Sequence, residues 1–127
     1  MRLAAYEREG TVLVGRLDVD GTIATIDERD EFWRDPLDAL ASEASGPVVS
    51  LSDVRQVPAV PVGARVVCVG LNYRNHAMEG GRGEDAIPTT PVIFGRWTAT
   101  LVCDGDECPV MEDRYDWEGE LGAVVGV

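Results

Sequence analysis

Two glutamates, Glu118 and Glu120, stand one residue apart near the C-terminal end of the chain. If their segment, residues 116–127, is a β-strand, alternate side chains face opposite ways. The two carboxylates then share one face, about 7 Å apart along the backbone. Carboxylate oxygens suit a hard divalent cation, so this spacing is compatible with a metal site. The alternative is a solvated strand edge whose glutamates bind nothing, and the pattern alone does not exclude it.

His76 is the only histidine of the chain, and Glu79 follows it by three residues. On a helix, positions i and i+3 lie on the same face. A carboxylate beside an imidazole fixes the tautomer of the ring and raises its basicity, which suits a general base that activates water. For this pair taken alone, the alternative is a surface contact without a catalytic role.

The elements that carry these residues predict a β-rich α+β fold. Short apolar runs separated by Glu-Gly and Asp-Gly turns predict a small antiparallel sheet in the first part of the chain. A helix should follow, with Asp35 as its cap and Pro36 in its first turn. The predicted strands of this part are residues 3–6, 11–17, 22–26 and 48–51, and the predicted helix is 35–44.

A proline-containing stretch, residues 57–63, predicts an extended linker and hence a domain boundary. We therefore predict a small N-terminal domain, 1–60, and the N-terminal part of a second domain, 61–127. The chain ends inside its last predicted strand, so we expect it to be a portion of a longer protein. The second part should hold strands 65–70, 91–96 and 98–102, a helix over 73–79 capped by Asn72, and a lid loop over 82–91.

The composition limits the class of partner. The net charge is −12, all 11 basic residues are arginine, and nucleic acid or anionic membrane surfaces are therefore unfavourable partners. The absence of lysine excludes Schiff-base chemistry within this sequence. No run approaches the roughly 18 apolar residues of a membrane span, and we expect a cytoplasmic protein. The three cysteines have neither zinc-site spacing nor an even count, so reduced thiols are expected.

Three segments together resemble the fumarylacetoacetate hydrolase family. They are Val67–Glu79, which includes the sequence Gly-Leu-Asn-Tyr-Arg-Asn-His-Ala-Met-Glu, then Pro91–Arg96, and then Asp116–Gly126 with its Trp-Glu-Gly-Glu-Leu-Gly sequence. The resemblance is specific over about residues 58–127. Residues 1–57 resemble the small and variable N-terminal region of the family.

The resemblance implies a small N-terminal antiparallel sheet followed by the incomplete start of a mixed β-roll catalytic domain. It implies a hydrolase or lyase that depends on Mg²⁺ or Mn²⁺, with Ca²⁺ as an alternative. The expected substrates are 2-oxo acids or 1,3-dicarbonyl compounds, as in aromatic catabolism: acylpyruvates cleaved at a carbon–carbon bond, oxaloacetate decarboxylated, or ring-cleavage products isomerised or decarboxylated. Glu118 and Glu120 would bind the metal, His76 and Glu79 would activate water, and the full-length protein would be a homodimer.

The sequence also departs from the family pattern. A third metal-binding aspartate and a lysine would lie beyond Val127, and Arg96 stands where many members have lysine. We therefore expect the 127-residue chain to be inactive by itself. The rival interpretation is a non-catalytic acidic β-domain that was retained for binding or assembly.

Overall fold

The computed structural model describes residues 1–79, 83, 87–113, 117 and 119–125. The chain divides into two compact units, one made of Met1–Ala59 with Val102–Val127 and the other of Val60–Leu101. The fold is rich in strands with few helices, which confirms the predicted β-rich α+β class. The division into domains 1–60 and 61–127 stays a prediction. Within the described ranges, no helix combines the length and apolar character that a bilayer-spanning segment requires.

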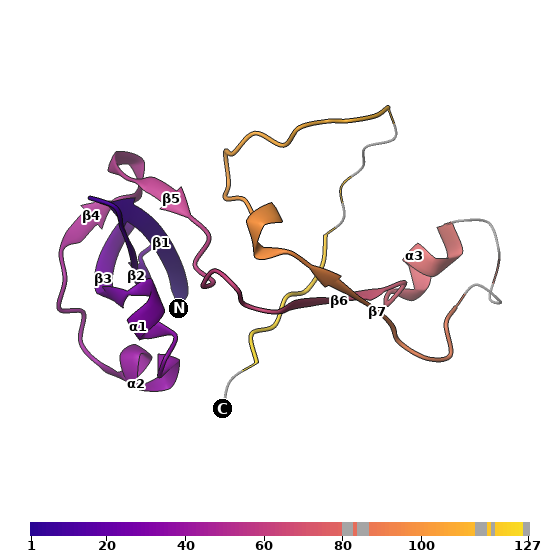
Figure 1. The fold of residues 1–127 in the computed structure, drawn as a ribbon, viewed down its shortest axis with the longest axis horizontal. Coiled ribbons are helices and arrows are strands. Elements are labelled where there is room, and N and C mark those ends of the chain that lie inside the picture. Colours follow the sequence, from indigo (N-terminus) through magenta and orange to yellow (C-terminus); the bar gives the residue numbers. More distant parts are fainter. Residues whose placement is uncertain (80–82, 84–86, 114–116, 118, 126–127) are drawn as a thin grey trace. The chain divides into compact units, whose positions relative to one another are not determined.

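A five-stranded antiparallel sheet with the order β4-β3-β2-β1-β5 forms the N-terminal part of the first unit (Figure 1). Its strands are β1 (Arg2–Arg8), β2 (Thr11–Leu17), β3 (Thr22–Glu28), β4 (Val48–Ser50) and β5 (Arg55–Val57). Glu9 and Gly10 join β1 to β2 with positive φ angles of 53° and 81°, as a tight hairpin turn requires. The predicted antiparallel sheet is confirmed. β5 was not predicted, because its sequence runs directly into the proline-containing stretch.

The sheet buries apolar side chains on both faces because alternate residues of each strand point in opposite directions. One cluster contains Ala5, Val14, Ile26 and Phe32, and the other contains Ala4, Tyr6 and Ile23. In the second, the Tyr6 hydroxyl lies 2.8 Å from the hydroxyl of buried Thr25, so both polar groups are satisfied.

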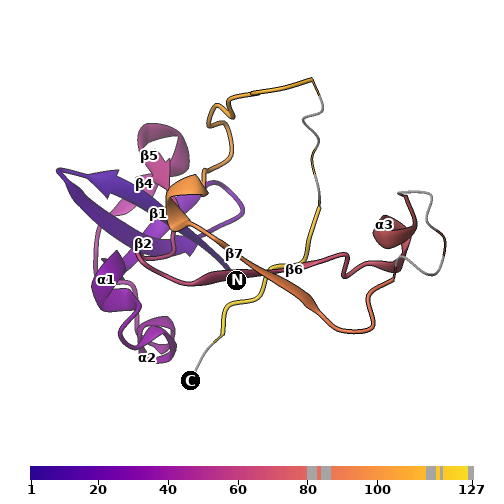
Figure 2. The same cartoon turned by 45° about the vertical axis from the view of Figure 1, so that its right-hand side comes forward.

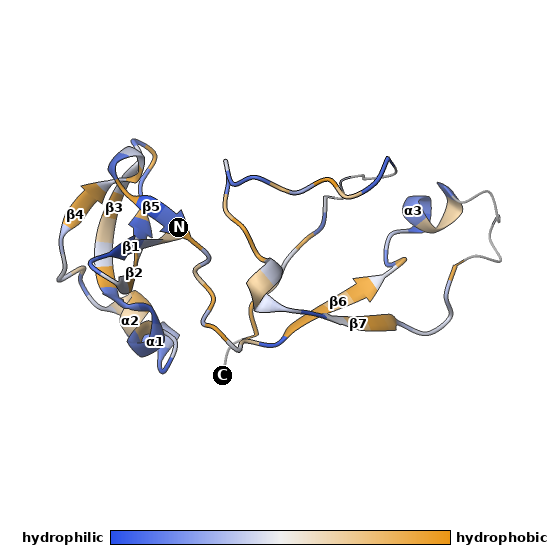
Figure 3. Cartoon of the chain, turned by 45° about the horizontal axis from the view of Figure 1, so that its top comes forward, coloured by the Kyte–Doolittle hydropathy of each residue, from blue (hydrophilic) through white to orange (hydrophobic). Residues whose placement is uncertain are grey.

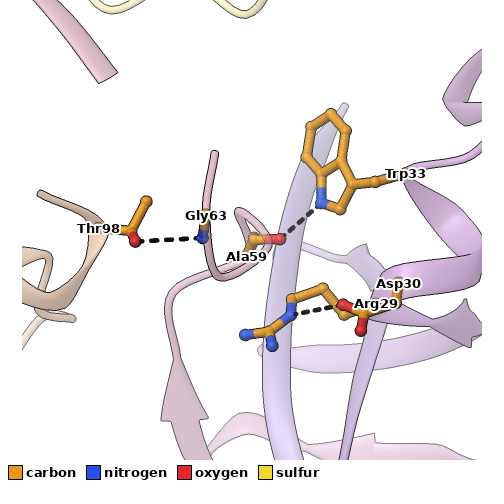
Figure 4. A network of polar contacts seen from close by, with 6 residues as sticks. All are labelled: Arg29, Asp30, Trp33, Ala59, Gly63 and Thr98. Carbon is orange, nitrogen blue, oxygen red and sulfur yellow. Dashed lines mark hydrogen bonds and ion pairs between the residues drawn. The ribbon is translucent and has the colours of Figure 1, made fainter. Parts of the chain in front are cut away.

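Two short helices, α1 (Arg29–Phe32) and α2 (Pro36–Ala41), pack on the first of these clusters through Phe32, Ala39 and Leu40. The side chain of Asp35 accepts a hydrogen bond from the amide of Asp38 at 3.1 Å, which confirms the predicted cap. Trp33 follows α1, and its indole Nε1 donates to the carbonyl oxygen of Ala59 at 2.7 Å (Figure 4). This bond connects Ala59, the last residue of the N-terminal part of this unit, to Trp33, which packs against the first apolar cluster.

The second unit is built on an antiparallel pair, β6 (Val66–Gly70) and β7 (Val92–Arg96), with the helix α3 (Arg74–Glu79) in the connection between them (Figure 2). The register joins Val66 to Arg96 at one end and Gly70 to Val92 at the other. Apolar residues cover β6 and part of β7 (Figure 3), and Val67 and Ile93 are 63% and 66% exposed. Outside the strands, the Gly63 amide donates to the Thr98 hydroxyl at 3.5 Å.

Three local predictions were wrong. Residues 98–100 form a 3₁₀ turn rather than a strand, since the amides of Thr100 and Leu101 bond back to the carbonyls of Trp97 and Thr98. α3 begins at Arg74, so the position before it is held by Tyr73 and not by Asn72. The described residues 119–125 of the predicted last strand have no regular secondary structure. The side chains of Leu121 and Val125 are 88% and 95% exposed, so neither is packed in an apolar cluster.

Candidate functional site

His76 and Glu79 lie on α3, one turn apart, and their side chains meet. Nδ1 of His76 is 3.1 Å from Oε2 of Glu79, a hydrogen-bond distance. The His76 side chain is 41% exposed and that of Glu79 is 71% exposed, so water reaches both. Between them on the helix, Ala77 is buried. The geometry is that of an imidazole oriented by a carboxylate, and its catalytic role stays a prediction.

The turn between β6 and α3 sets the position of the helix that carries His76 and Glu79. Leu71, directly after the strand, has a φ of 53°, the left-handed conformation that a non-glycine residue adopts at a cost of roughly 1–2 kcal/mol. Strained backbone of this kind clusters at functional sites. The turn is short, since α3 starts at Arg74, three residues after Leu71.

A hollow of about 370 Å³, here called the turn pocket, lies beside this turn. Its lining comprises residues 69–72, Arg74 and residues 87–92. Most of the described side chains that line it are apolar or neutral, and among these described residues Arg74 is the charged one. The sequence does not predict this pocket, because its far wall is formed by residues 87–92, which lie more than twelve residues further along the chain.

The metal-binding half of the predicted site is less fully described. Glu120 is exposed, and Glu118 lies outside the described residues. Among the described residues, no group of three histidine, cysteine, aspartate or glutamate side chains is placed to hold a metal ion. A carboxylate is the donor type that Mg²⁺ and Mn²⁺ accept, so the chemistry of Glu120 fits either ion. The metal site as a whole stays a prediction.

Cysteine chemistry lies outside this site. Cys103 opens a turn in which its amide donates to Oδ2 of Asp106 at 2.7 Å, and the Asp106 amide returns a bond to the Cys103 carbonyl. Burial raises the pKa of the Cys103 thiol, and the nearby Asp106 carboxylate raises it further. Cys68, Cys103 and Cys108 are all free thiols, as expected. Cys68 is half-buried rather than enclosed in a core.

The comparisons with known proteins place these residues in a family. Residues 65–127 match the family description "Fumarylacetoacetate (FAA) hydrolase C-terminal". Over these residues, the chain belongs to the fumarylacetoacetate hydrolase family. The matched range includes β6, α3 with the His76–Glu79 pair, β7 and both glutamates, so the predicted family is confirmed.

Two curated proteins that are similar to this family member come from species of Burkholderia. A protein of Burkholderia lata is 33% identical over 146 residues, which cover 99% of this chain and 47% of the relative. A protein of Burkholderia orbicola is 41% identical over 64 residues, which cover 49% of this chain and 22% of the relative. Their names assign them provisionally to the hydrolases and give no substrate. The chain thus spans about half the length of the curated relatives it matches, and no solved structure matches it.

Proposed function

We propose that the full-length protein is a divalent-metal-dependent hydrolase that cleaves a carbon–carbon bond of a 2-oxo acid or 1,3-dicarbonyl compound. The observation that carries this proposal is the hydrogen bond between His76 and Glu79, found inside the family's matched range. Membership of the family and the hydrolase class in the names of the relatives support the reaction class. An acylpyruvate is the substrate type that we favour.

In this reaction the role of His76 is to take a proton from water. Because a carboxylate can only accept, Glu79 holds the proton of the imidazole on Nδ1. The basic lone pair is then on Nε2, which accepts the proton as the water oxygen attacks the substrate carbonyl carbon. The positive charge that forms on the ring lies beside the Glu79 carboxylate, which stabilises it.

The overall change balances without any redox partner. Water adds to the carbonyl carbon of the acyl group, the carbon–carbon bond breaks, and its electron pair leaves on the pyruvate part as an enolate. Protonated His76 returns the proton to that carbon, which gives a carboxylic acid and pyruvate. Glu118 and Glu120 would hold the cation, which when bound supplies electrostatic stabilisation of the developing negative charge.

The proposal is tested on the purified full-length protein with acetylpyruvate and Mn²⁺, with loss of the 1,3-dicarbonyl absorbance as the readout. We expect metal-dependent hydrolysis, and we expect Glu118→Ala to lose Mn²⁺ binding in calorimetry while Glu107→Ala, a matched surface change, keeps it. Absence of hydrolysis with acylpyruvates, oxaloacetate and ring-cleavage analogues alike, together with unchanged metal affinity in Glu118→Ala, would instead support a non-catalytic binding domain.

Our remaining proposals concern the oligomeric state, the location and the ligand class of the full-length protein. We propose a homodimer of the full-length protein in the cytoplasm, with a small oxo acid rather than nucleic acid as its ligand. The net charge of −12 supports the last point because it disfavours polyanions.

A further inference from the structure

The strand pair β6–β7 of the second unit carries apolar side chains on both of its faces. The register places Cys68 opposite Phe94 on one face and Val69 opposite Ile93 on the other. Val67 lies two residues before Val69 and therefore shares its face. A strand with one solvated face alternates apolar with polar residues, whereas a strand that is buried on both faces has a nearly continuous apolar sequence. The sequence of this pair is therefore typical of strands in the interior of a protein.

The side chains of this pair are nevertheless open to solvent. Val92 and Phe94 are 46% and 53% exposed on one face, and Val67 and Ile93 are more exposed still on the other. We call these four side chains the ribbon surface. Exposed apolar patches of this kind mark interaction sites, and a pair of two strands is by itself only marginally stable without further strands or a packed layer. The pair therefore needs an apolar layer on each face.

The length of the relatives indicates what can supply this layer. More than half of the Burkholderia lata protein lies outside the part that matches this chain. A segment of the same polypeptide is held near the strand pair at a high effective concentration, which a separate molecule does not have. A second copy is a poorer occupant, because each chain carries a net charge of −12 and a two-fold contact would cover only one of the two faces.

We infer that the ribbon surface is an intramolecular docking site, covered in the full-length protein by apolar segments that lie outside the 127 residues of this chain. The helix α3 lies in the connection between β6 and β7. The cover that holds the two strands would therefore also hold both ends of the connection that carries His76. The inference concerns packing and does not depend on which reaction His76 takes part in.

Photo-crosslinking identifies the occupant directly. The full-length protein is produced with p-benzoylphenylalanine in place of Phe94, and in a second preparation in place of Ile93, so that each face carries one probe. After irradiation, the joined peptides are identified by mass spectrometry. We expect crosslinks within single polypeptides that join the probes to apolar segments outside residues 1–127. The same probe in place of Val19, which is 92% exposed between β2 and β3, should give no crosslink to those segments.

Every other occupant gives a different product, and each such product overturns the inference. A crosslinked product with the mass of two chains would identify a second copy. Crosslinks that end only within residues 1–127 would identify another part of this chain as the cover. Absence of crosslinks from both positions would show that the ribbon surface stays open to water.

A substitution measures the same cover through stability. Ile93→Asp places a carboxylate where the cover would bury it, and burial of an unpaired charge is strongly destabilising. In the full-length protein, Ile93→Asp should lower the thermal unfolding midpoint by roughly 5 °C or more, whereas the matched change Val19→Asp should shift it little. Equal midpoints in the two variants would overturn the inference. If Ile93→Asp yields no folded protein, Ile93→Thr is compared with Val19→Thr by the same criterion.

Both measurements are made without substrate, which separates this inference from the proposed function. If no acylpyruvate is hydrolysed but the crosslinks form as described, the proposed function fails and the docking site stands. If hydrolysis occurs and the probes join no segment outside residues 1–127, only the docking site is refuted.

Discussion

Nδ1 of His76 lies 3.1 Å from Oε2 of Glu79, and both side chains project from the six-residue helix α3. The pair is partly open to solvent, and the ring of His76 is oriented by the carboxylate of Glu79. A general base needs both features, access to water and a fixed ring orientation. We therefore expect His76 and Glu79 to contribute to catalysis in different ways.

His76→Ala should lower kcat for acylpyruvate hydrolysis by about 10²–10⁴-fold, the usual contribution of a positioned general base. Glu79→Gln should lower it less, because glutamine can still accept a bond from Nδ1 but no longer carries the charge that stabilises an imidazolium. Steady-state kinetics of the full-length protein measures both, and calorimetric Mn²⁺ titration should show unchanged metal affinity in each variant. Parental turnover in His76→Ala would refute the role of the histidine.

Gly15 provides a test of the N-terminal sheet. A Cβ added there would lie 2.5 Å from the carbonyl oxygen of Ala24 and 2.6 Å from Cγ2 of Ile23, at the irregular step in the β2–β3 pairing. Because backbone must move to relieve the first contact, Gly15→Ala should lower the free energy of unfolding by about 1–3 kcal/mol. Gly95→Ala is the matched strand control, since a Cβ there meets no atom within 4 Å. Urea unfolding followed by circular dichroism compares them, and equal midpoints would contradict the predicted clash.

Cys103 should react slowly with iodoacetamide at pH 8. Since burial and the Asp106 charge raise the pKa of its thiol, less thiolate is present at a given pH than in an ordinary cysteine, and the rate should keep rising as the pH is increased above 9. Asp106→Asn removes the charge while keeping an oxygen that can accept the Cys103 amide, so alkylation at pH 8 should accelerate roughly two- to fivefold. Peptide-resolved mass spectrometry gives the rates, with Asp104→Asn as control. A slower reaction in Asp106→Asn would show that the sign is wrong.

The sequence could predict those features that depend on residues close together in the chain. The hairpins of the first sheet follow from alternation and Glu-Gly or Asp-Gly turns, and β2 has the predicted bounds, Thr11–Leu17. The meeting of His76 with Glu79 follows from helical spacing alone. Asp35 caps α2 as predicted for the same reason: a cap involves only the next three residues.

Features that depend on residues far apart in the sequence, or on the outcome of competing hydrogen bonds, could not be predicted in this way. β5 forms because it pairs with the open edge of β1, with Ala5 opposite Val57. No local sequence pattern predicts that pairing. Residues 98–100 are rich in threonine, which favours strands, but local 3₁₀ bonds to Trp97 and Thr98 prevail. Residues 119–125 alternate as a strand would, yet they have no regular secondary structure, because alternation alone does not provide the pairing that a strand needs. The turn pocket depends on residues 87–92 lying beside the end of β6 and Arg74, which no local pattern predicts.

The position of the first sheet within the N-terminal 59 residues has a consequence for synthesis on the ribosome. All five of its strands, both apolar clusters and the bond from Trp33 to Ala59 are contained in the first 59 residues. Chains emerge from the N-terminus, and units whose contacts are local in sequence can form as they appear. This sheet can therefore be complete before the histidine-bearing helix leaves the exit tunnel, so that both of its apolar clusters are already buried when the apolar strands β6 and β7 emerge.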